Sequence, residues 1–372
     1  MVNAVLARDT LFTPFQIRGV NLKNRFIMPA MQRGQCRDGA PSPELAAYYQ
    51  RRVVGGVSLV IGESCAVDHP SATAQPIACR LNAQTLSAWA ACVSAVNDAG
   101  GEMLLQLWHE GAHRNDDDGA TLSPSGYAHP RLQRGHAATK QEIEELVDAY
   151  VRSARMAQSI GAAGIELHCA HGYLLDQFLW AKTNLRDDGY GGADMAARAR
   201  FPAELLRAIR SACGDDFVLS VRFSQWKEAD YDAMIAETPE ALETFLAIMR
   251  DAGADIFHAS TRRFWERAWE GSPDTLAGWT RRLGGLPTIA VGSVGLDRDV
   301  MQSFEDEQEA TTTTAASLTR LREGMDDGQF DLVAVGRSLI GDPDWVKKVQ
   351  AGRLGEVRAF CKADVQSLEW DS

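Results

Sequence analysis

The chain alternates short, nearly continuous apolar segments with longer segments whose apolar residues recur at helical spacing. The short segments favour β-structure and have no polar face, which is typical of strands covered on both sides of a parallel sheet. Eight such strands are predicted, at residues 25–31, 57–63, 103–108, 164–168, 217–223, 255–260, 287–292 and 331–336.

The segments between these strands carry the signals of amphipathic helices. Helices are predicted over 142–160, 201–212 and 239–252, each with its apolar residues on one stripe. The third begins at Thr238-Pro239, an N-cap followed by proline at the first helical position. Strands that alternate with helices imply a parallel sheet joined by right-handed crossovers.

Eight strand–helix units predict a closed (β/α)8 TIM barrel that forms a single domain over residues 1–372. Neither G-x-G-x-x-G nor a P-loop motif occurs in the sequence, which disfavours open nucleotide-binding sheets. Alternating apolar residues around Gly19 predict a hairpin at about 12–24 that closes the bottom of the barrel. Residues 304–329 combine an acidic stretch, four threonines and a short helical pattern, and we predict a surface insertion there.

The net charge and the cysteine content limit the binding partners and the cellular compartment that we expect. The net charge of −12 disfavours duplex nucleic acid and anionic membranes as partners. No apolar run reaches the length of a membrane span, and the first residues lack the apolar core of a signal peptide. Seven cysteines without a C-x-x-C pair fit reduced thiols. We therefore expect a cytoplasmic protein, as a monomer or a small homo-oligomer.

Candidate chemistry follows from the carboxyl ends of the strands, where barrels of this kind build their active sites. The residues expected at that face are Met31, Ser64, Gln106, His168, Arg222, Gly292, Ser293, Gly336 and Arg337. The last four come from two turns after neighbouring strands. Their backbone N–H groups and the guanidinium of Arg337 predict a phosphate-binding site.

Two imidazoles and a phenol follow the fourth strand, at His168, His171 and Tyr173. Two imidazoles that project into one pocket can donate hydrogen bonds to a single oxygen and stabilise charge that develops on it. The phenol could supply a proton. Spacing alone leaves two other interpretations open, a pair of metal ligands or histidines with a structural role.

His109-Glu110-Gly111-Ala112-His113 matches the H-E-x-x-H pattern of zinc hydrolases. That motif needs a helix, so that both histidines share one face and the glutamate serves as the base. Here it follows directly on a strand and contains a glycine, which disfavours a helix. A zinc hydrolase that uses His109 and His113 is therefore a minor alternative.

A series of motifs along nearly the whole chain resembles the old yellow enzymes, which are flavin-dependent ene-reductases. LFTPFQIRGVNLKNRFIMPAM is similar to the N-terminal hairpin and first strand of that family, and LLQLWHEGAHR is similar to its third strand. ELHCAHGYLLDQFL followed by NLRDDGYGG resembles its most specific signature. LSVRFS, TIAVGSV and DLVAVGRSLIGDPDWV resemble its fifth, seventh and eighth strands, in the same order.

The resemblance implies a barrel that binds FMN, is reduced by NADPH or NADH, and reduces an activated alkene such as an enone. By this resemblance His168 and His171 would bind the substrate carbonyl, and Tyr173 would protonate the α-carbon. Gln106 and Arg222 would contact the flavin ring, which Pro29, Ala30 and Ser64 would line. Gly292, Ser293, Gly336 and Arg337 would bind the phosphate.

The sequence also departs from this family. Met31 stands where relatives commonly have threonine or cysteine, and its thioether cannot donate a hydrogen bond, so we expect a different flavin potential. The Trp-rich segment 261–279 is expected to be a packed loop, with a lid over the substrate as the alternative. Cys169 is expected to be buried and inert, because neighbouring residues of a strand point to opposite faces.

Two further functions stay open. One is a flavin-dependent amine dehydrogenase or demethylase on the same barrel, although longer relatives of that kind carry iron–sulfur clusters that this chain lacks the cysteines to bind. The other is a non-catalytic barrel that binds flavin or an aromatic ligand. The His168, His171 and Tyr173 set disfavours the second, because binding alone needs no proton donor.

Overall fold

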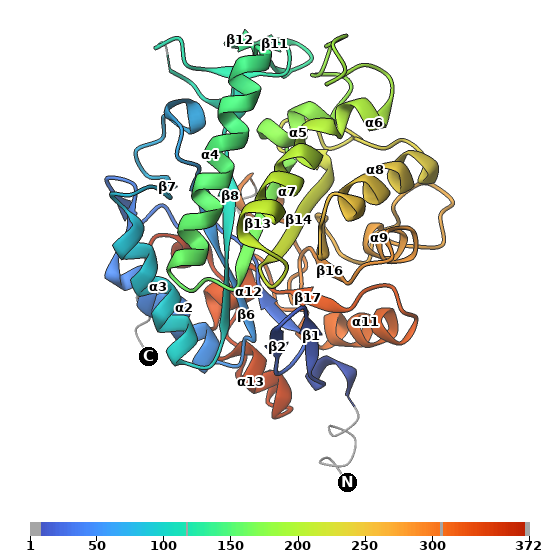
Figure 1. Cartoon of the computed structure of the whole chain (residues 1–372). Helices are drawn as coiled ribbons and strands as arrows, with labels where there is room; N and C mark the ends of the chain where they lie inside the picture. The colour runs from blue at the N-terminus through green and yellow to red at the C-terminus, as the bar shows by residue number, and fades with distance from the viewer. Residues whose placement is uncertain (1–8, 117, 306–307, 369–372) are drawn as a thin grey trace.

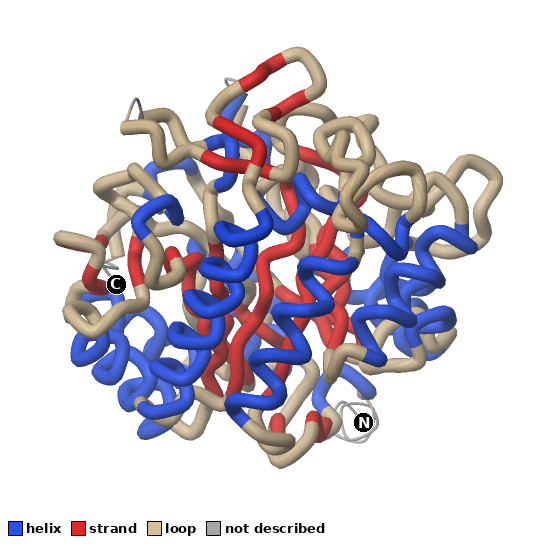
Figure 2. Tube along the Cα trace, turned by 45° about the horizontal axis from the view of Figure 1, so that its top comes forward, coloured by secondary structure: helices blue, strands red, loops and turns tan. Residues whose placement is uncertain are grey.

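The computed structural model describes residues 9–116, 118–305 and 308–368. Its centre is a closed parallel barrel of eight strands, surrounded by helices (Figures 1 and 2). The barrel closes because β3 pairs with both β17 and β6. The eight strands are β3 (Phe26–Met28), β6 (Leu59–Ala66), β8 (Glu102–Trp108), β13 (Gly164–His171), β14 (Val218–Lys227), β15 (Ile256–Ser260), β16 (Thr288–Val291) and β17 (Leu332–Ala334). The predicted TIM barrel is confirmed.

The helices that cover the barrel are α2 (Pro43–Val54), α3 (Leu86–Asp98), α4 (Lys140–Ser159), α7 (Arg200–Cys213), α8 (Pro239–Asp251), α9 (Leu276–Gly284) and α11 (Thr314–Asp326). Shorter helices are α5 (Leu174–Leu179), α6 (Met195–Arg198), α10 (Val300–Glu305), α12 (Arg337–Gly341) and α13 (Trp345–Gln350). The three helices predicted from periodicity are confirmed as α4, α7 and α8. Thr238 caps α8 as expected, and a capping box of Thr139 and Glu142 begins α4. None of the described helices has the length and apolar character that a membrane crossing requires.

Several short strands lie outside the eight strands of the barrel. β4 (Cys36–Arg37) pairs with β5 (Ala40–Pro41), and β7 (Cys79–Arg80) pairs with the end of β6. β9 (Leu122–Ser123), β10 (Tyr127–His129), β11 (Leu132–Gln133) and β12 (His136–Ala137) lie in the long connection between β8 and α4.

Several predicted strand boundaries need correction. The second strand extends past its predicted end to Ala66, and the eighth ends early, at Ala334. The first strand ends at Met28, three residues early, because Pro29 has no N–H group for the ladder. The fourth strand extends to His171, across an irregularity in its pairing with β14. The fifth strand extends to Lys227. The last two extensions carry residues of the functional site above the barrel.

The predicted hairpin is confirmed: β1 (Phe15–Ile17) pairs with β2 (Val20–Leu22) through a turn at Arg18-Gly19. Figure 1 shows it below the barrel, near the N-terminus. The apolar side chains of Ile17, Val20 and Leu22 are buried and pack against apolar residues inside the barrel. The hairpin therefore closes the end of the barrel opposite to the functional site.

The prediction of a surface insertion at 304–329 is wrong for its second half. Residues 314–326 form α11, which buries Leu318, Leu321 and Met325. This helix is the barrel's own connection between β16 and β17, and its short apolar stripe was too weak to identify it as such. Residues 306–307 lie outside the described part of the chain.

Candidate functional site

The thirteen candidate residues all line two adjoining cavities at the carboxyl ends of the barrel strands. The larger cavity, of about 340 Å³, is lined by Pro29, Ala30, Met31, His171, Arg222, Gly292, Ser293, Gly336 and Arg337 among others. The smaller cavity, of about 170 Å³, is lined by Ala30, Ser64, Gln106, His168, His171, Tyr173 and Arg222 among others. Ala30, Gln32, His171, Arg222 and Glu228 line both. The two cavities therefore form one continuous site.

His168, His171 and Tyr173 surround the smaller cavity. The ring centroid of His168 lies 5.2 Å from that of His171 and 5.0 Å from that of Tyr173. His171 has a φ of +64°, in the left-handed region that residues other than glycine seldom adopt. This conformation accompanies the irregular end of β13 and turns the chain so that three functional side chains face one space.

Burial and charge keep both imidazoles neutral. Burial, with a further effect from the positive charge of Arg222, lowers the pKa of His168 to about 3. The same two causes hold the pKa of His171 well below its ordinary value. Burial, followed by the charge of Glu228, raises the pKa of Tyr173 far above its ordinary value. At neutral pH the site therefore presents two neutral imidazoles and a protonated phenol.

Hydrogen bonds indicate which ring nitrogen carries the proton. The Ala170 N–H donates to His168 Nδ1 at 3.4 Å, which places the proton of this neutral ring on Nε2. Ser260 Oγ lies 2.9 Å from His171 Nε2 and 3.3 Å from a guanidinium nitrogen of Arg222, which can only donate. Ser260 therefore accepts from Arg222, and either its O–H or its second lone pair can pair with His171 Nε2, so this contact is compatible with both tautomers of His171.

A chain of buried polar groups crosses the barrel interior below the smaller cavity. Ser64 Oγ lies 2.5 Å from Gln106 Oε1, and Gln106 Nε2 donates to Glu166 at 2.8 Å. Glu166 also lies 2.8 Å from His258 Nδ1 and accepts a bond from Ser220. Burial alone would raise the pKa of Glu166, but His258 and Arg222 lower it to about 2. This ionised carboxylate fixes the orientation of the Gln106 amide, whose oxygen accepts and whose nitrogen donates.

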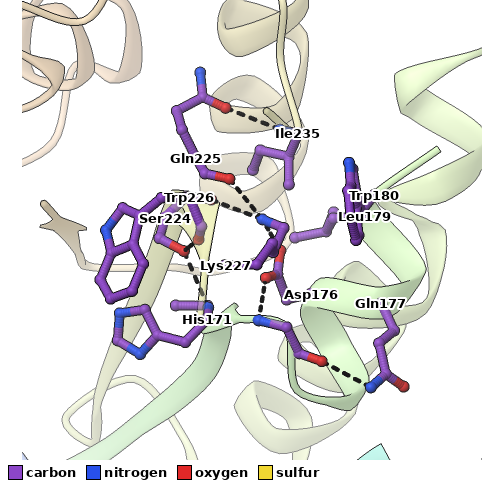
Figure 3. A network of polar contacts seen from close by, with 12 residues as sticks. His171, Asp176, Gln177, Leu179, Trp180, Ser224, Gln225, Trp226, Lys227 and Ile235 are labelled. Atoms are coloured by element: carbon purple, nitrogen blue, oxygen red, sulfur yellow. Dashed lines mark hydrogen bonds and ion pairs between the residues drawn. The ribbon is translucent and has the colours of Figure 1, made fainter. Parts of the chain in front are cut away.

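A second polar network lies behind the turn that carries His171 (Figure 3). Lys227 Nζ lies 2.9 Å from Asp176 Oδ1, and both side chains are buried. Asp176 Oδ2 accepts a 2.6 Å bond from the Gly172 N–H, and the His171 N–H donates to Ser224 Oγ at 3.0 Å. Asp176 of the ion pair therefore holds the Gly172 N–H, and Ser224 of β14 holds the His171 N–H, so that both N–H groups of the turn between β13 and α5 are fixed.

The other end of the larger cavity is rich in cationic and polar groups. One guanidinium nitrogen of Arg337 donates to Ser293 Oγ at 3.3 Å and to the Arg298 carbonyl at 2.6 Å. Burial lowers the pKa of Arg337 to about 10, so it stays charged at neutral pH. Gly292 has a φ of +145°, and a Cβ there would lie 2.6 Å from the Thr261 carbonyl oxygen. This position therefore requires glycine.

Comparison with known proteins agrees with this geometry. Residues 10–356 match the model of the NADH:flavin oxidoreductase / NADH oxidase family. The chain belongs to that family. It is an FMN-dependent NAD(P)H oxidoreductase of the old yellow enzyme type.

Individual relatives of this flavin oxidoreductase are distant. An NADH oxidase of Thermoanaerobacter brockii is 32% identical over 95% of this chain, which spans only 53% of that protein. A 12-oxophytodienoate reductase 7 of Oryza sativa is 30% identical over 91% of this chain and 87% of its own length. A solved old yellow enzyme homologue from Zymomonas mobilis superposes with a TM-score of 0.76 at 22% identity, covering 97% of this chain and 100% of that one.

The residues of the site fit FMN. One end of the larger cavity carries the cationic side chain of Arg337 and the hydroxyl of Ser293. An apolar wall that includes Pro29 and Val291 lies on another side. The Nε atom of Arg222 is buried and has no hydrogen-bond partner among the described residues. An unpartnered buried donor of this kind suits a polar group of a bound ligand. Arg337, Ser293 and the backbone of Gly292 and Gly336 would hold the phosphate.

The H-E-x-x-H pattern is not a metal site. Gly111–His113 form a short 3-10 turn, and His109 Nε2 lies 2.8 Å from Ser71 Oγ. Among residues 9–116, 118–305 and 308–368, no cluster of three or more His, Cys, Asp or Glu side chains could hold a metal ion. The zinc hydrolase alternative loses its structural basis.

Several residues of the site were not predicted. Glu166 lies two positions before His168 in β13, and His258 and Ser260 alternate in β15. Polar residues two positions apart in an apolar strand point to the same face, and this pattern could have identified them from the sequence. Glu228 lies beyond the predicted end of its strand, so no local pattern marked it.

The Trp-rich segment is a packed loop. Trp269 and Trp279 are in edge-to-face contact with ring centroids 5.5 Å apart, and both pack partly buried against the core. Arg262 from the same segment lines the larger cavity. Cys169 is fully buried, and burial raises the pKa of its thiol, as expected for an inert cysteine.

Proposed function

We propose that this chain reduces the carbon–carbon double bond of an alkene conjugated to a carbonyl group, with NAD(P)H as the reductant. The observation that carries the proposal is the set of neutral His168, neutral His171 and protonated Tyr173 around the smaller cavity. The relative named 12-oxophytodienoate reductase supports this class of substrate.

The two histidines bind and polarise the carbonyl oxygen. The Nε2–H of His168 is left free by the hydrogen bond at its Nδ1, and we assign the second donor to Nδ1 of His171, whose Nε2 is already in contact with Ser260. Two donors aimed at one oxygen stabilise the negative charge that develops there during reduction. FMN held at this site would supply the hydride-transfer chemistry between the nicotinamide and the alkene.

Arg222 and Tyr173 complete the polar set. Arg222 carries a positive charge between the two cavities, which favours a bound group that becomes anionic. Tyr173 holds the proton that balances the reduction, and it gives this proton to the carbon next to the carbonyl. An amine dehydrogenase on the same barrel is the second candidate, but two neutral donors beside a phenol suit a carbonyl oxygen better than an ammonium group.

The visible spectrum tests the proposal. Purified protein loaded with FMN is bleached anaerobically by NADPH, and the absorbance then returns when 2-cyclohexenone is added. Bleaching without return would contradict alkene reduction and favour another oxidant or an amine substrate.

His171→Ala should slow reoxidation by the enone about a hundredfold to a thousandfold, because loss of one such donor costs roughly 2.7–4 kcal/mol of barrier. Stopped-flow absorbance measures both half-reactions, and reduction by NADPH serves as the internal control. Reoxidation at the parent rate would remove His171 from carbonyl binding.

A further inference from the structure

The residue that directly follows β14, Glu228, has an acidic side chain beside the phenol of Tyr173. Glu228 lines both cavities, whereas its neighbour Lys227 points the other way, to Asp176 (Figure 3). The carboxyl group of Glu228 and the phenol of Tyr173 both line the smaller cavity, close enough for each to shift the pKa of the other. The residue as a whole is also partly exposed to solvent, although protein atoms surround its carboxyl group. It therefore joins a buried proton donor to water, and the function proposed above leaves it unused.

The protonation state of this carboxyl group decides whether the phenol donates its hydrogen bond to Glu228 or to a substrate. A tyrosine hydroxyl has one hydrogen, and an ionised carboxylate can only accept. While Glu228 is ionised, Tyr173 therefore donates to it and not to a substrate. When Glu228 is neutral, its own O–H can donate to the phenol oxygen, and the phenol hydrogen is free to point into the smaller cavity.

We propose that neutral Glu228 supplies protons to Tyr173, an inference that rests on Tyr173 being the acid of the proposed reaction. The O–H bond of Tyr173 breaks as the C–H bond forms on the substrate. The O–H bond of Glu228 breaks as a new O–H bond forms on Tyr173. The resulting carboxylate then takes a proton from water, and this relay changes no oxidation state.

The groups around the carboxyl suit this cycle. Tyr173 and Arg222 face it and favour its ionised form, while His171, Arg33 and Arg262 line the same larger cavity. The protein atoms packed around Glu228 outweigh these effects and raise its pKa above the ordinary value of a carboxylic acid. A raised pKa increases the share of the neutral carboxyl at any given pH, which favours its role as a proton donor.

The rate of flavin reoxidation by 2-cyclohexenone, measured against pH, tests the relay. The parent should slow about tenfold for each pH unit above the pKa of Glu228. Glu228→Gln should be about tenfold slower than the parent at acidic pH and independent of pH, because an amide can orient the phenol but cannot replace its proton. Glu237→Gln, at an exposed position that lines neither cavity, is the matched control and should keep the parent profile.

Chemical rescue separates a relay from a structural role. Glu228→Ala should regain at least half of the lost rate when formate is added, in proportion to the concentration of formic acid. Glu228→Gln should not respond, because its amide fills the same space. Infrared spectra give a readout without turnover: a protonated carboxyl band should disappear in Glu228→Gln and shift in Tyr173→Phe.

Two results would overturn the relay: a parent-like pH profile in Glu228→Gln, or no rescue of Glu228→Ala by formate. Tyr173→Phe distinguishes this failure from a failure of the proposed function. If Tyr173→Phe reoxidises at the parent rate, Tyr173 is not the acid and the underlying proposal fails. If Tyr173→Phe is slow while the Glu228 variants match the parent, only the relay fails.

Discussion

Gly292 illustrates how a single position can be fixed by geometry. It follows β16 with a φ of +145°, and a Cβ would approach backbone atoms of two neighbours, the Thr261 oxygen at 2.6 Å and the Arg263 nitrogen at 2.9 Å. Because backbone atoms cannot move aside as a flexible side chain can, a substitution must displace the segment that borders the cationic end of the larger cavity.

Gly292→Ala should therefore weaken FMN binding and lower the free energy of unfolding by about 1–3 kcal/mol, the usual effect of forcing an extra carbon into a packed site. FMN titration followed by fluorescence and urea unfolding measure the two effects. Gly352→Ala is the control, since Gly352 has a φ of +69° but open space around its Cα. That variant should lose about 1 kcal/mol from backbone strain alone and keep its FMN affinity. Equal FMN affinity in Gly292→Ala and the parent would contradict the assignment of Gly292 to FMN binding.

At the scale of elements, the contact between β14 and α5 decides how the site is held. The ion pair of Lys227 and Asp176 is almost completely buried, and its aspartate also binds the Gly172 N–H. Burial raises the pKa of Asp176 to about 6, although Lys227 opposes this shift. A carboxylate in such a place depends on its partner to remain ionised.

Lys227→Met should lower the free energy of unfolding by about 3–5 kcal/mol, because it leaves Asp176 buried without its partner. The double variant Lys227→Met/Asp176→Asn should recover part of this loss, since its asparagine is neutral. Urea unfolding measures both variants. If the double variant were no more stable than Lys227→Met, the loss would come from packing and not from the unpaired charge.

At the scale of the whole molecule, the barrel has a structural end and a functional end. The β1–β2 hairpin fills the bottom with apolar side chains, while the cavities lie at the carboxyl ends of the strands. Since no residue of the hairpin lines either cavity, stability and ligand binding should respond separately to substitutions in the hairpin.

Ile17→Ala should cost about 2–5 kcal/mol of unfolding free energy, because Ile17 is only 3% exposed and its loss leaves a cavity. FMN affinity of the folded protein should stay unchanged. Asn21→Ala, at an exposed position on the same hairpin, should affect neither quantity. Thermal unfolding and FMN titration provide the comparison, and a large drop in FMN affinity in Ile17→Ala would contradict the separation of the two ends.

The sequence by itself determined the strand–helix alternation, the hairpin and the residues that gather at the strand ends. These features are encoded locally, by unbroken apolar runs, by helical periodicity and by polar residues that end a strand. Because the carboxyl ends of parallel strands meet at one face, His168, Arg222 and Gly292 could be brought together from their strand positions alone.

Only the tertiary structure decided which of these groups touch. Glu166 meets His258 across 92 residues of sequence, and Glu228, in the turn after the extended β14, lies beside Tyr173 at the smaller cavity. His109 and His113 match a metal motif but occupy a strand end and a tight turn. Side-chain contacts, burial and the resulting pKa values depend on neighbours that are distant along the chain, so local patterns cannot encode them.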